Sequence, residues 1–295
     1  MIRLLIAAVV IPLGLDLYVP VPEDNPMTVE NIELGRRLFN DRRLSRDGTI
    51  ACASCHDPER AFAGSEPVAH GIAGRRGRRN APALINRAWG RSFSWDGRVA
   101  ALEVQVVRPI EDPNEMDLAI ELAADRVGVP PRLLARALAT YVRSIMSGNA
   151  PYDRYVSGDA GALSAEAQLG LQVFRGKGNC TACHTGPTFT DEQFHNTGIA
   201  WNGSGLFLDE GRAAISGEPE DRGAFKTPTL REVELSAPYM HDGSLRSLDE
   251  VIEYYDRGGN RHSHIDPELR GLGLTAAEKR GLIAFLRSLS GDVSQ

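Results

Sequence analysis

Two copies of the pattern Cys-x-x-Cys-His constrain this chain more than any other feature of its sequence. One copy occupies residues 52–56 and the other residues 180–184, and together they contain all four cysteines. Two thiols at this spacing can form thioethers to the two vinyl groups of a haem, and the adjoining histidine then lies beneath the iron. A zinc site or a redox dithiol also uses paired cysteines, but neither explains the adjoining histidine twice. We therefore expect two haems of the c type, attached through Cys52, Cys55, Cys180 and Cys183, with His56 and His184 as iron ligands.

A short helical pattern occurs before each motif. Residues 34–39 and 169–174 share the form Leu-Gly-x-x-aliphatic-Phe, and each leads into its Cys-x-x-Cys-His. The repetition indicates an internal duplication of one structural unit. A glycine inside a helix costs about 1 kcal/mol relative to alanine. Its recurrence at Gly35 and Gly170 therefore predicts a close contact at both places, such as a crossing helix.

The remaining pattern is that of helices joined by long loops. Thr28, Ser164 and Thr275 are suitable N-caps for helices that begin after them, and a further helix is predicted over residues 129–146. Long alternating strand patterns are absent. We therefore predict an all-α protein of two cytochrome c-like domains with long loops, each binding one covalently attached haem.

The domain organisation follows from the N-terminal segment and from the duplication. Arg3 precedes an apolar run over residues 4–15, which is shorter than the roughly 20 residues that span a bilayer and is typical of a secretory signal. We expect a signal peptide or leader over 1–20, an N-terminal haem domain over 21–160 and a C-terminal haem domain over 161–295. The protein should be periplasmic and contact a membrane only through an uncleaved leader.

The charge of the chain excludes one class of partner. The formal net charge is −6, with 33 basic and 39 acidic residues. We therefore expect no nucleic-acid partner.

The second axial position of each iron decides its chemistry. A strong sixth ligand makes a haem an electron carrier, whereas an open position makes it a catalyst. Residue types alone leave the choice open among the tyrosines, the other histidines and the methionines beyond the leader. These histidines and methionines are His70, His195, His241, His262, His264, Met27, Met116, Met146 and Met240.

Four stretches make the chain similar to the bacterial di-haem cytochrome c peroxidase and MauG family. The first is the Leu-Gly helix with its haem motif, and the second is Arg-Asn-Ala-Pro-Ala-Leu at 79–84. The third begins with Trp-Asp-Gly-Arg and covers residues 95–116; the fourth comprises Phe-Lys-Thr-Pro-Thr-Leu-Arg at 225–231 and Ala-Pro-Tyr-Met-His-Asp-Gly at 237–243. The resemblance covers nearly everything after the leader.

The resemblance assigns the reaction with peroxide to the haem on His56. Glu115 matches the family's distal acid–base carboxylate, with Gln105 beside it and Pro109 lining the pocket. Cleavage of the O–O bond needs a proton removed from one peroxide oxygen and delivered to the other, which a carboxylate in a shielded pocket can do. Trp95 resembles the tryptophan between the haems that relays electrons or oxidising equivalents.

The resemblance also implies a calcium ion between the haems. Asn80 matches the side-chain ligand, and Ser236 and Pro238 match the backbone-carbonyl ligands; oxygen donors suit a hard cation. The family more often has threonine where this chain has Ser236, but a carbonyl ligand is unaffected by that change.

The sixth ligand of the His184 haem divides the family, because peroxidases carry methionine there and MauG-type members carry tyrosine. The segment 248–255 matches the one that bears this ligand and indicates Tyr255. Tyr254, by a slip of one residue, and Met240 are the alternatives. An anionic tyrosinate would stabilise oxidised iron. His70 lies in the loop where some members carry a histidine that caps the peroxide-reacting haem until reduction removes it.

These features together predict a periplasmic di-haem peroxidase of the MauG-like type. Hydrogen peroxide would be reduced at the N-terminal haem, and a protein substrate or redox partner would be oxidised through the second haem. One alternative is a conventional cytochrome c peroxidase that takes electrons from a small cytochrome or cupredoxin. Another is a di-haem electron carrier without catalysis.

Overall fold

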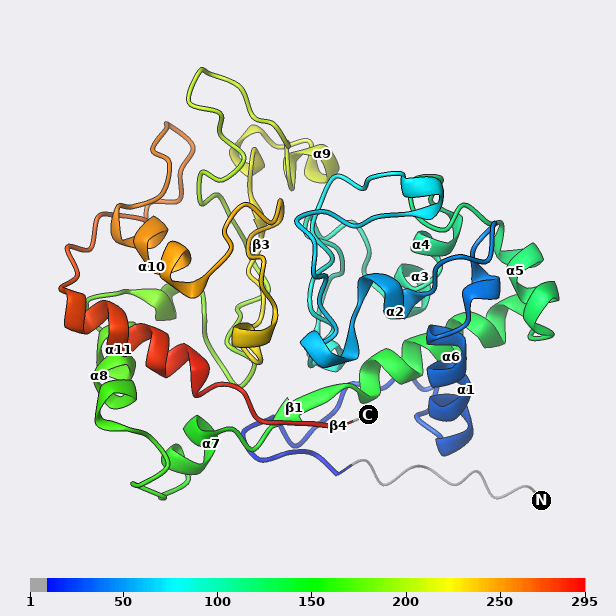
Figure 1. Ribbon diagram of the computed structural model, residues 1–295, viewed down its shortest axis with the longest axis horizontal. Helices are drawn as coiled ribbons and strands as arrows, with labels where there is room; N and C mark the ends of the chain where they lie inside the picture. Colours follow the sequence, from blue (N-terminus) through cyan, green and yellow to red (C-terminus); the bar gives the residue numbers. More distant parts are fainter. Residues whose placement is uncertain (1–9, 295) are drawn as a thin grey trace.

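A computed structural model describes residues 10–294 and places most helices in two groups with loops between them (Figure 1). The helices of the first group are α1 (Val29–Phe39), α2 (Cys52–Cys55), α3 (Leu102–Gln105), α4 (Arg108–Glu111), α5 (Ile120–Val127) and α6 (Pro131–Ser144). Those of the second are α7 (Pro151–Val156), α8 (Ala165–Arg175), α10 (Leu248–Asp256) and α11 (Ala276–Arg287). The short α9 (Ala213–Ser216) lies within a long loop. This largely helical architecture is consistent with two cytochrome c-like domains.

Each group is built on a pair of packed helices, α1 with α6 and α8 with α11. The predicted contact of the recurring glycine is confirmed in both. A Cβ on Gly35 would lie 2.0 Å from the carbonyl oxygen of Ala137 on α6, and one on Gly170 would lie 1.8 Å from that of Gly281 on α11. No side chain fits at these distances, so glycine lets the two backbones touch.

The predicted N-caps are also confirmed. The hydroxyls of Thr28, Ser164 and Thr275 each accept a hydrogen bond from a backbone N–H in the first turn of α1, α8 and α11. Thr275 forms a full capping box with Glu278, which satisfies two otherwise unpaired donors.

The phenylalanine of each Leu-Gly helix enters an aromatic core. Phe39 is 2% exposed and packs edge-to-face against Tyr141 of α6. Phe174 is 3% exposed and packs against Phe285 of α11. Each buried ring contributes about 2–3 kcal/mol of hydrophobic stabilisation. The two cores therefore repeat one arrangement, as the duplication predicts.

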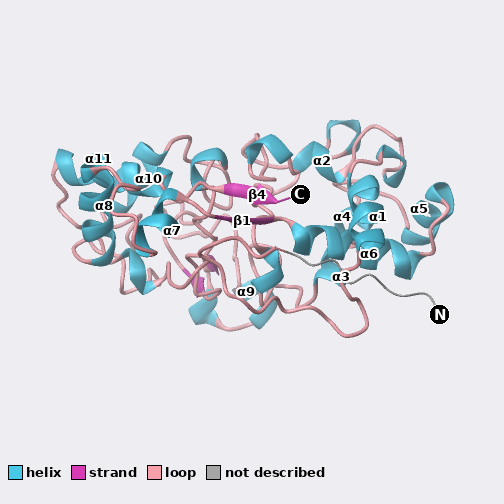
Figure 2. Cartoon of the chain, turned by 90° about the horizontal axis from the view of Figure 1, so that it is seen from below, coloured by secondary structure: helices cyan, strands magenta, loops and turns pink. Residues whose placement is uncertain are grey.

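Two short ribbons connect segments that are far apart in the sequence. Strand β1 (Met146–Gly148) pairs antiparallel with β4 (Asp292–Ser294), and β2 (Phe194–His195) pairs antiparallel with β3 (Phe225–Lys226). Seen from below, β1 and β4 lie between the two helical groups (Figure 2), and Val293 packs against the first core. The last residues of the chain thus contact the half that was predicted to end at residue 160.

The N-terminal segment also packs onto both halves. Of the predicted leader, residues 1–9 lie outside the described residues. The carbonyl oxygen of Leu13 accepts a hydrogen bond from Asn149 N, and that of Gly14 accepts one from the Arg231 guanidinium. Leu15 is 8% exposed. A chain cleaved after residue 20 would lose these contacts. In the described part of the chain, every helix is too short or too polar to span a membrane.

Candidate functional site: a cavity between two haem motifs

Both Cys-x-x-Cys-His motifs reach one cavity of 610 Å³. The motif residues on its wall are Cys55, His56, Cys180, Cys183 and His184. Cys52 belongs to the same helical turn as Cys55 but packs against the first core. None of the four cysteines forms a disulfide bond. The fold therefore brings the two motifs to a common space from the two halves.

The two motif histidines have the same hydrogen-bonding pattern. Nδ1 of His56 lies 3.0 Å from the carbonyl oxygen of Phe62, and Nδ1 of His184 lies 2.9 Å from that of Phe189. Because a carbonyl only accepts, Nδ1 carries the proton in both rings and Nε2 keeps its lone pair. Burial lowers the pKa of both imidazoles, which favours the neutral form that binds metals.

The rest of the wall suits a large apolar prosthetic group. Aliphatic and aromatic side chains from both halves contribute to it, including Leu84, Phe93, Leu102, Phe174, Ile252 and Leu286. Free thiols, imidazoles with an available Nε2 and an apolar wall are what a covalently attached haem requires. The residues of both motifs therefore fit such a group, and His56 and His184 would hold its iron.

Glu115 lies on the cavity wall near the first motif. Burial raises the pKa of the Cys55 thiol, and the Glu115 charge raises it further, so the two groups are close. Burial, and then the charge of Asp112, raise the pKa of Glu115 to about 7 despite the opposing effect of Arg98. A carboxyl with this pKa can both accept and donate a proton near neutral pH, as an acid–base catalyst must.

Gln105 and Pro109 line the same cavity, at the end of α3 and in α4. The Ser94 hydroxyl donates to Gln105 Oε1 at 3.0 Å, so the amide NH₂ group is left to donate to a ligand. The backbone N–H of Met116 donates to the Pro109 carbonyl at 3.0 Å. This bond ties the loop that carries Glu115 to α4.

Trp95 lies on the wall where the two halves meet. Its indole Nε1 donates to the carbonyl oxygen of Asn80 in the first half at 2.8 Å. Its own carbonyl oxygen accepts from the backbone N–H of Lys226 in the second half, also at 2.8 Å. The tryptophan is therefore fixed to both halves, which is the placement that a relay between the two motifs requires.

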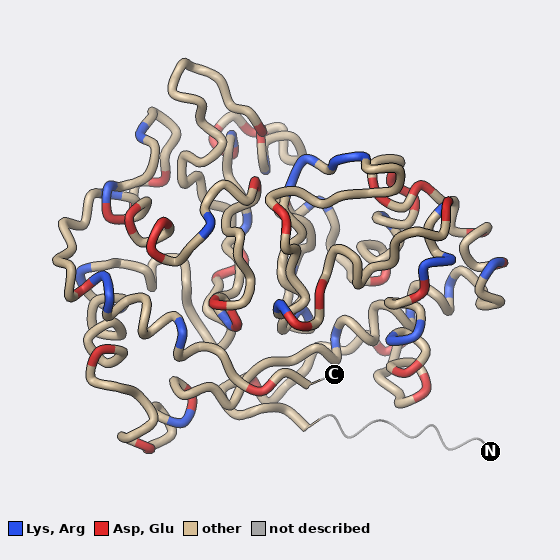
Figure 3. Tube along the Cα trace, viewed as in Figure 1, with Lys and Arg blue, Asp and Glu red and all other residues tan. Residues whose placement is uncertain are grey.

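An ion cluster beside Trp95 also joins the halves, and sequence reasoning gave it no role. Arg79 lies 2.6 Å from Asp96 and makes a two-pronged pair with Asp209 at 2.8 Å; Arg98 also pairs with Asp96. Burial opposes ionisation of Asp209, but Arg79 outweighs it and lowers the pKa of Asp209 to about 2. Acidic and basic residues are otherwise distributed over both halves (Figure 3). Nothing in the local sequence marks Asp209.

The three candidates for the sixth ligand of the haem on His184 lie in different surroundings. Tyr255 and Met240 line the cavity, whereas Tyr254 does not. The Tyr254 hydroxyl donates to the Thr197 carbonyl at 2.7 Å and accepts from Asn260 N at 3.1 Å. Burial, the neighbouring Tyr254 and then the thiols of the second motif raise the pKa of Tyr255. Tyr255 therefore lies near the second motif, and Tyr254 is occupied elsewhere.

The side chain of His70 is exposed and lies outside the cavity wall. Only its carbonyl oxygen approaches the first motif, 3.8 Å from Cys55 Sγ. In this conformation the His70 side chain does not reach the cavity in which it would cap the first haem. The histidines outside the motifs that reach the cavity are His195 and His241, and the His241 ring stacks on Phe225 at 3.6 Å.

The residues expected to bind calcium all lie on the cavity wall. Asn80 contributes from the first half, and Ser236 and Pro238 contribute from the second. Asn80 Nδ2 donates to the Glu66 carbonyl at 2.9 Å, which leaves Oδ1 for a cation. These oxygen donors are of the kind that calcium prefers.

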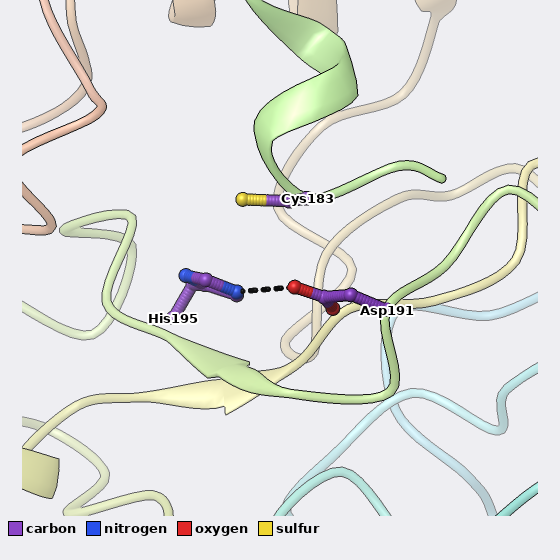
Figure 4. Close-up of side chains that lie close together, drawn as sticks. All are labelled: Cys183, Asp191 and His195. Atoms are coloured by element: carbon purple, nitrogen blue, oxygen red, sulfur yellow. Dashed lines mark hydrogen bonds and ion pairs between the residues drawn. The ribbon is translucent and has the colours of Figure 1, made fainter. Parts of the chain in front are cut away.

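One further group of three side chains has the composition of a metal site, namely Cys183, Asp191 and His195 (Figure 4). His195 Nε2 lies 2.9 Å from Asp191, and its Nδ1 lies 2.6 Å from Asp266. The Cys183 thiol and these two carboxylates raise the pKa of His195 to about 10, although burial opposes this. Both ring nitrogens are engaged, and a thioether at Cys183 would remove its thiolate, so this group does not favour a separate ion.

Comparisons with known proteins agree with this geometry. The family described as di-haem cytochrome c peroxidase matches residues 29–132. The methylamine utilization protein MauG of Methylorubrum extorquens is 38% identical, with 93% of this chain and 82% of that protein covered. Cytochrome-c peroxidase IdrP2 of Denitromonas iodatirespirans is 36% identical over 92% of this chain and 84% of its own length.

A solved structure supports the same assignment. The crystal structure of a MauG-like protein associated with microbial copper homeostasis superimposes with a TM-score of 0.86, at 34% identity and with 94% of both chains covered. The chain therefore belongs to the di-haem cytochrome c peroxidase and MauG family of haem peroxidases.

Proposed function

We propose that this protein is a periplasmic di-haem peroxidase of the MauG-like type. The observation that carries the proposal is the asymmetry of the cavity. Glu115 lies near the first motif, whereas Tyr255 lies near the second. Residues 21–160 would hold the peroxide-reacting haem and residues 161–295 its redox partner. The apolar run near the N-terminus supports export.

The chain's own residues would move the protons of the reaction. Bound haem would supply the iron at which peroxide is reduced. The Glu115 carboxylate would accept the proton of one peroxide oxygen and return it to the other, so that water leaves. The amide NH₂ of Gln105 would hold the peroxide by hydrogen bonding, and Pro109 would exclude water from that wall. In total, peroxide takes up two electrons and two protons and gives two molecules of water.

The second half would supply the two electrons. Trp95, hydrogen-bonded to both halves, would serve as the electron relay between the halves, and Tyr255 would hold the second haem together with His184. A calcium ion bound by Asn80, Ser236 and Pro238 would fix the two halves beside Trp95. The electrons would come from a protein substrate or from a redox partner.

Addition of stoichiometric hydrogen peroxide to the fully oxidised protein tests the proposal. We expect both haems to change in optical and Mössbauer spectra in the parent protein and in Glu111→Gln, whose side chain is exposed and outside the cavity. Glu115→Gln should react much more slowly. The proposal is refuted if the parent spectra do not change, or if Glu115→Gln reacts like the parent.

A conventional cytochrome c peroxidase is the second candidate, because Met240 lines the same cavity as Tyr255. Steady-state turnover of peroxide with a reduced small cytochrome or cupredoxin separates the two candidates. Rapid turnover that survives Tyr255→Phe but is lost in Met240→Leu would favour the conventional peroxidase.

A further inference from the structure

A second ion cluster lies between the halves, and its charges do not balance. Arg87 of the first half lies 2.9 Å from Glu192 of the second, and Lys226 Nζ lies 3.4 Å from the same carboxylate. The three side chains are only 8–10% exposed. Two buried cations therefore share one buried anion.

The cluster around Arg79 gives a direct contrast. There two cations, Arg79 and Arg98, meet two carboxylates, Asp96 and Asp209, so that cluster is neutral. Transfer of an unbalanced charge out of water is costly unless a counter-ion reaches it. The excess positive charge of the cluster around Lys226 is therefore removed either by loss of the Lys226 proton or by an anion that the described chain does not supply.

Glu192 is held mainly by donors other than Lys226. Its two oxygens accept from the Arg87 guanidinium at 2.9 and 3.2 Å, and from the backbone N–H of Arg91 at 3.1 Å. Lys226 makes the longest of these contacts, and its ammonium has no other hydrogen-bond acceptor among residues 10–294. An ammonium has three donors, so at least two of them remain available.

The proton on Lys226 is held weakly in these surroundings. Burial, and then the charge of Arg87, lower the pKa of Lys226 to about 7, although Glu192 opposes the shift. Burial alone would raise the pKa of Glu192, but Arg87 and Lys226 hold it below the ordinary value. An additional carboxylate beside Lys226 would stabilise the ammonium.

The free donors have access to the space where haem would lie, because Arg87 and Lys226 both line the cavity that the two motifs share. Each haem carries two propionate carboxylates, which are anions of the required charge and can accept from both a guanidinium and an ammonium. We propose that Arg87 and Lys226 bind a haem propionate at the boundary between the halves, and that Lys226 supplies the positive charge that Glu192 leaves unbalanced.

This inference rests on haem binding but not on the peroxide chemistry. A buried positive charge near a haem disfavours its oxidised form, so loss of that charge should lower the midpoint potential. A unit charge at a separation of about 10 Å and an effective dielectric constant of about 20 changes an equilibrium constant by roughly tenfold. For a one-electron couple, tenfold corresponds to about 59 mV.

The test is a spectroelectrochemical titration of the purified holoprotein near neutral pH. The three lysines of the chain are Lys177, Lys226 and Lys279, and Lys177 offers a matched control because it is 41% exposed and pairs with Glu278 outside the cavity. We expect Lys226→Met to lower the midpoint potential of at least one haem. The expected shift corresponds to a change of about tenfold in the equilibrium constant for reduction. Lys226→Arg and Lys177→Met should retain the parent potentials.

Haem content, measured as pyridine haemochrome, and the propionate bending bands in resonance Raman spectra are recorded on the same samples. If the parent protein contains no haem, the assignment of the cofactor is wrong. If the potentials and bands of Lys226→Met equal those of the parent, only the role of Lys226 is rejected. If the midpoint potential of Lys226→Arg falls as far as that of Lys226→Met, packing rather than charge is responsible and the proposal fails. If Lys226→Met carries no haem while Lys226→Arg does, the positive charge is required for haem binding, which supports the proposal.

Discussion

The pKa of Glu115 gives a quantitative prediction for the reaction with peroxide. A carboxyl with a pKa of about 7 is ionised in about one molecule in a hundred at pH 5 and in about nine of ten at pH 8. If the ionised form accepts the peroxide proton, the rate constant should rise about tenfold per pH unit up to neutrality and then level off. A solvent-exposed glutamate would give a nearly flat profile over the same range.

The assay is stopped-flow mixing of oxidised protein with excess peroxide, followed at the haem absorbance from pH 5 to pH 8. Glu115→Gln should lower the rate constant by about 10²- to 10⁴-fold and remove the pH dependence. Asp112→Asn should shift the midpoint of the profile to lower pH, because the Asp112 charge raises the pKa of Glu115. A midpoint near 4.5, or a profile that survives in Glu115→Gln, would show that another group transfers the proton.

Three further substitutions test the helix packing, the sixth ligand of the second haem and the ion pair between Arg79 and Asp209. Gly170→Ala should lower the free energy of unfolding, measured in urea, by about 1–3 kcal/mol, because the methyl group would overlap the backbone of α11. The control Gly161→Ala, at a position with room for a methyl group, should change the free energy of unfolding by less than about 0.5 kcal/mol. Equal effects of the two substitutions would contradict the packing argument. Tyr255→Phe should alter the EPR signal of one haem in the resting oxidised protein while Tyr254→Phe leaves it unchanged, and the reverse result would assign the ligand to Tyr254. The pKa of Asp209 is lowered in the folded state, so the ionised carboxylate stabilises the fold above pH 4, and this stabilisation is lost as the pH falls towards 2. Urea unfolding should therefore show Asp209→Asn to be less stable than the parent near pH 6 but not near pH 2. The expected difference near pH 6 is about 1–2 kcal/mol, which allows for screening by solvent.

The features that could be predicted from the sequence are those with a local signal. An N-cap such as Thr28 or Ser164 lies next to the helix that it begins, and the Cys-x-x-Cys-His spacing is confined to five residues. The glycine contacts were also predictable, because Gly35 and Gly170 repeat in one pattern and a helical glycine needs a reason. These signals were sufficient for the helices and for the duplicated unit.

The features that escaped prediction depend on contacts between distant residues. Arg79 and Asp209 are 130 residues apart, and neither belongs to a periodic pattern. The charge imbalance around Lys226 exists only because Arg87 and Glu192 come from different halves and are buried together. Sequence reasoning located the chemistry of the two motifs but not the ion pairs that hold the halves around the cavity.

The pairing of β1 with β4 bears on how this protein is assembled. Ser294 closes a contact with Met146, 148 residues earlier, so β1 gains its partner strand only after both Cys-x-x-Cys-His motifs have been made. A chain made from its N-terminus exposes both Cys-x-x-Cys-His motifs before that strand exists. Contacts of such long sequence separation form slowly. The contact between β1 and β4 that ties the two halves together therefore forms after the local contacts within each half.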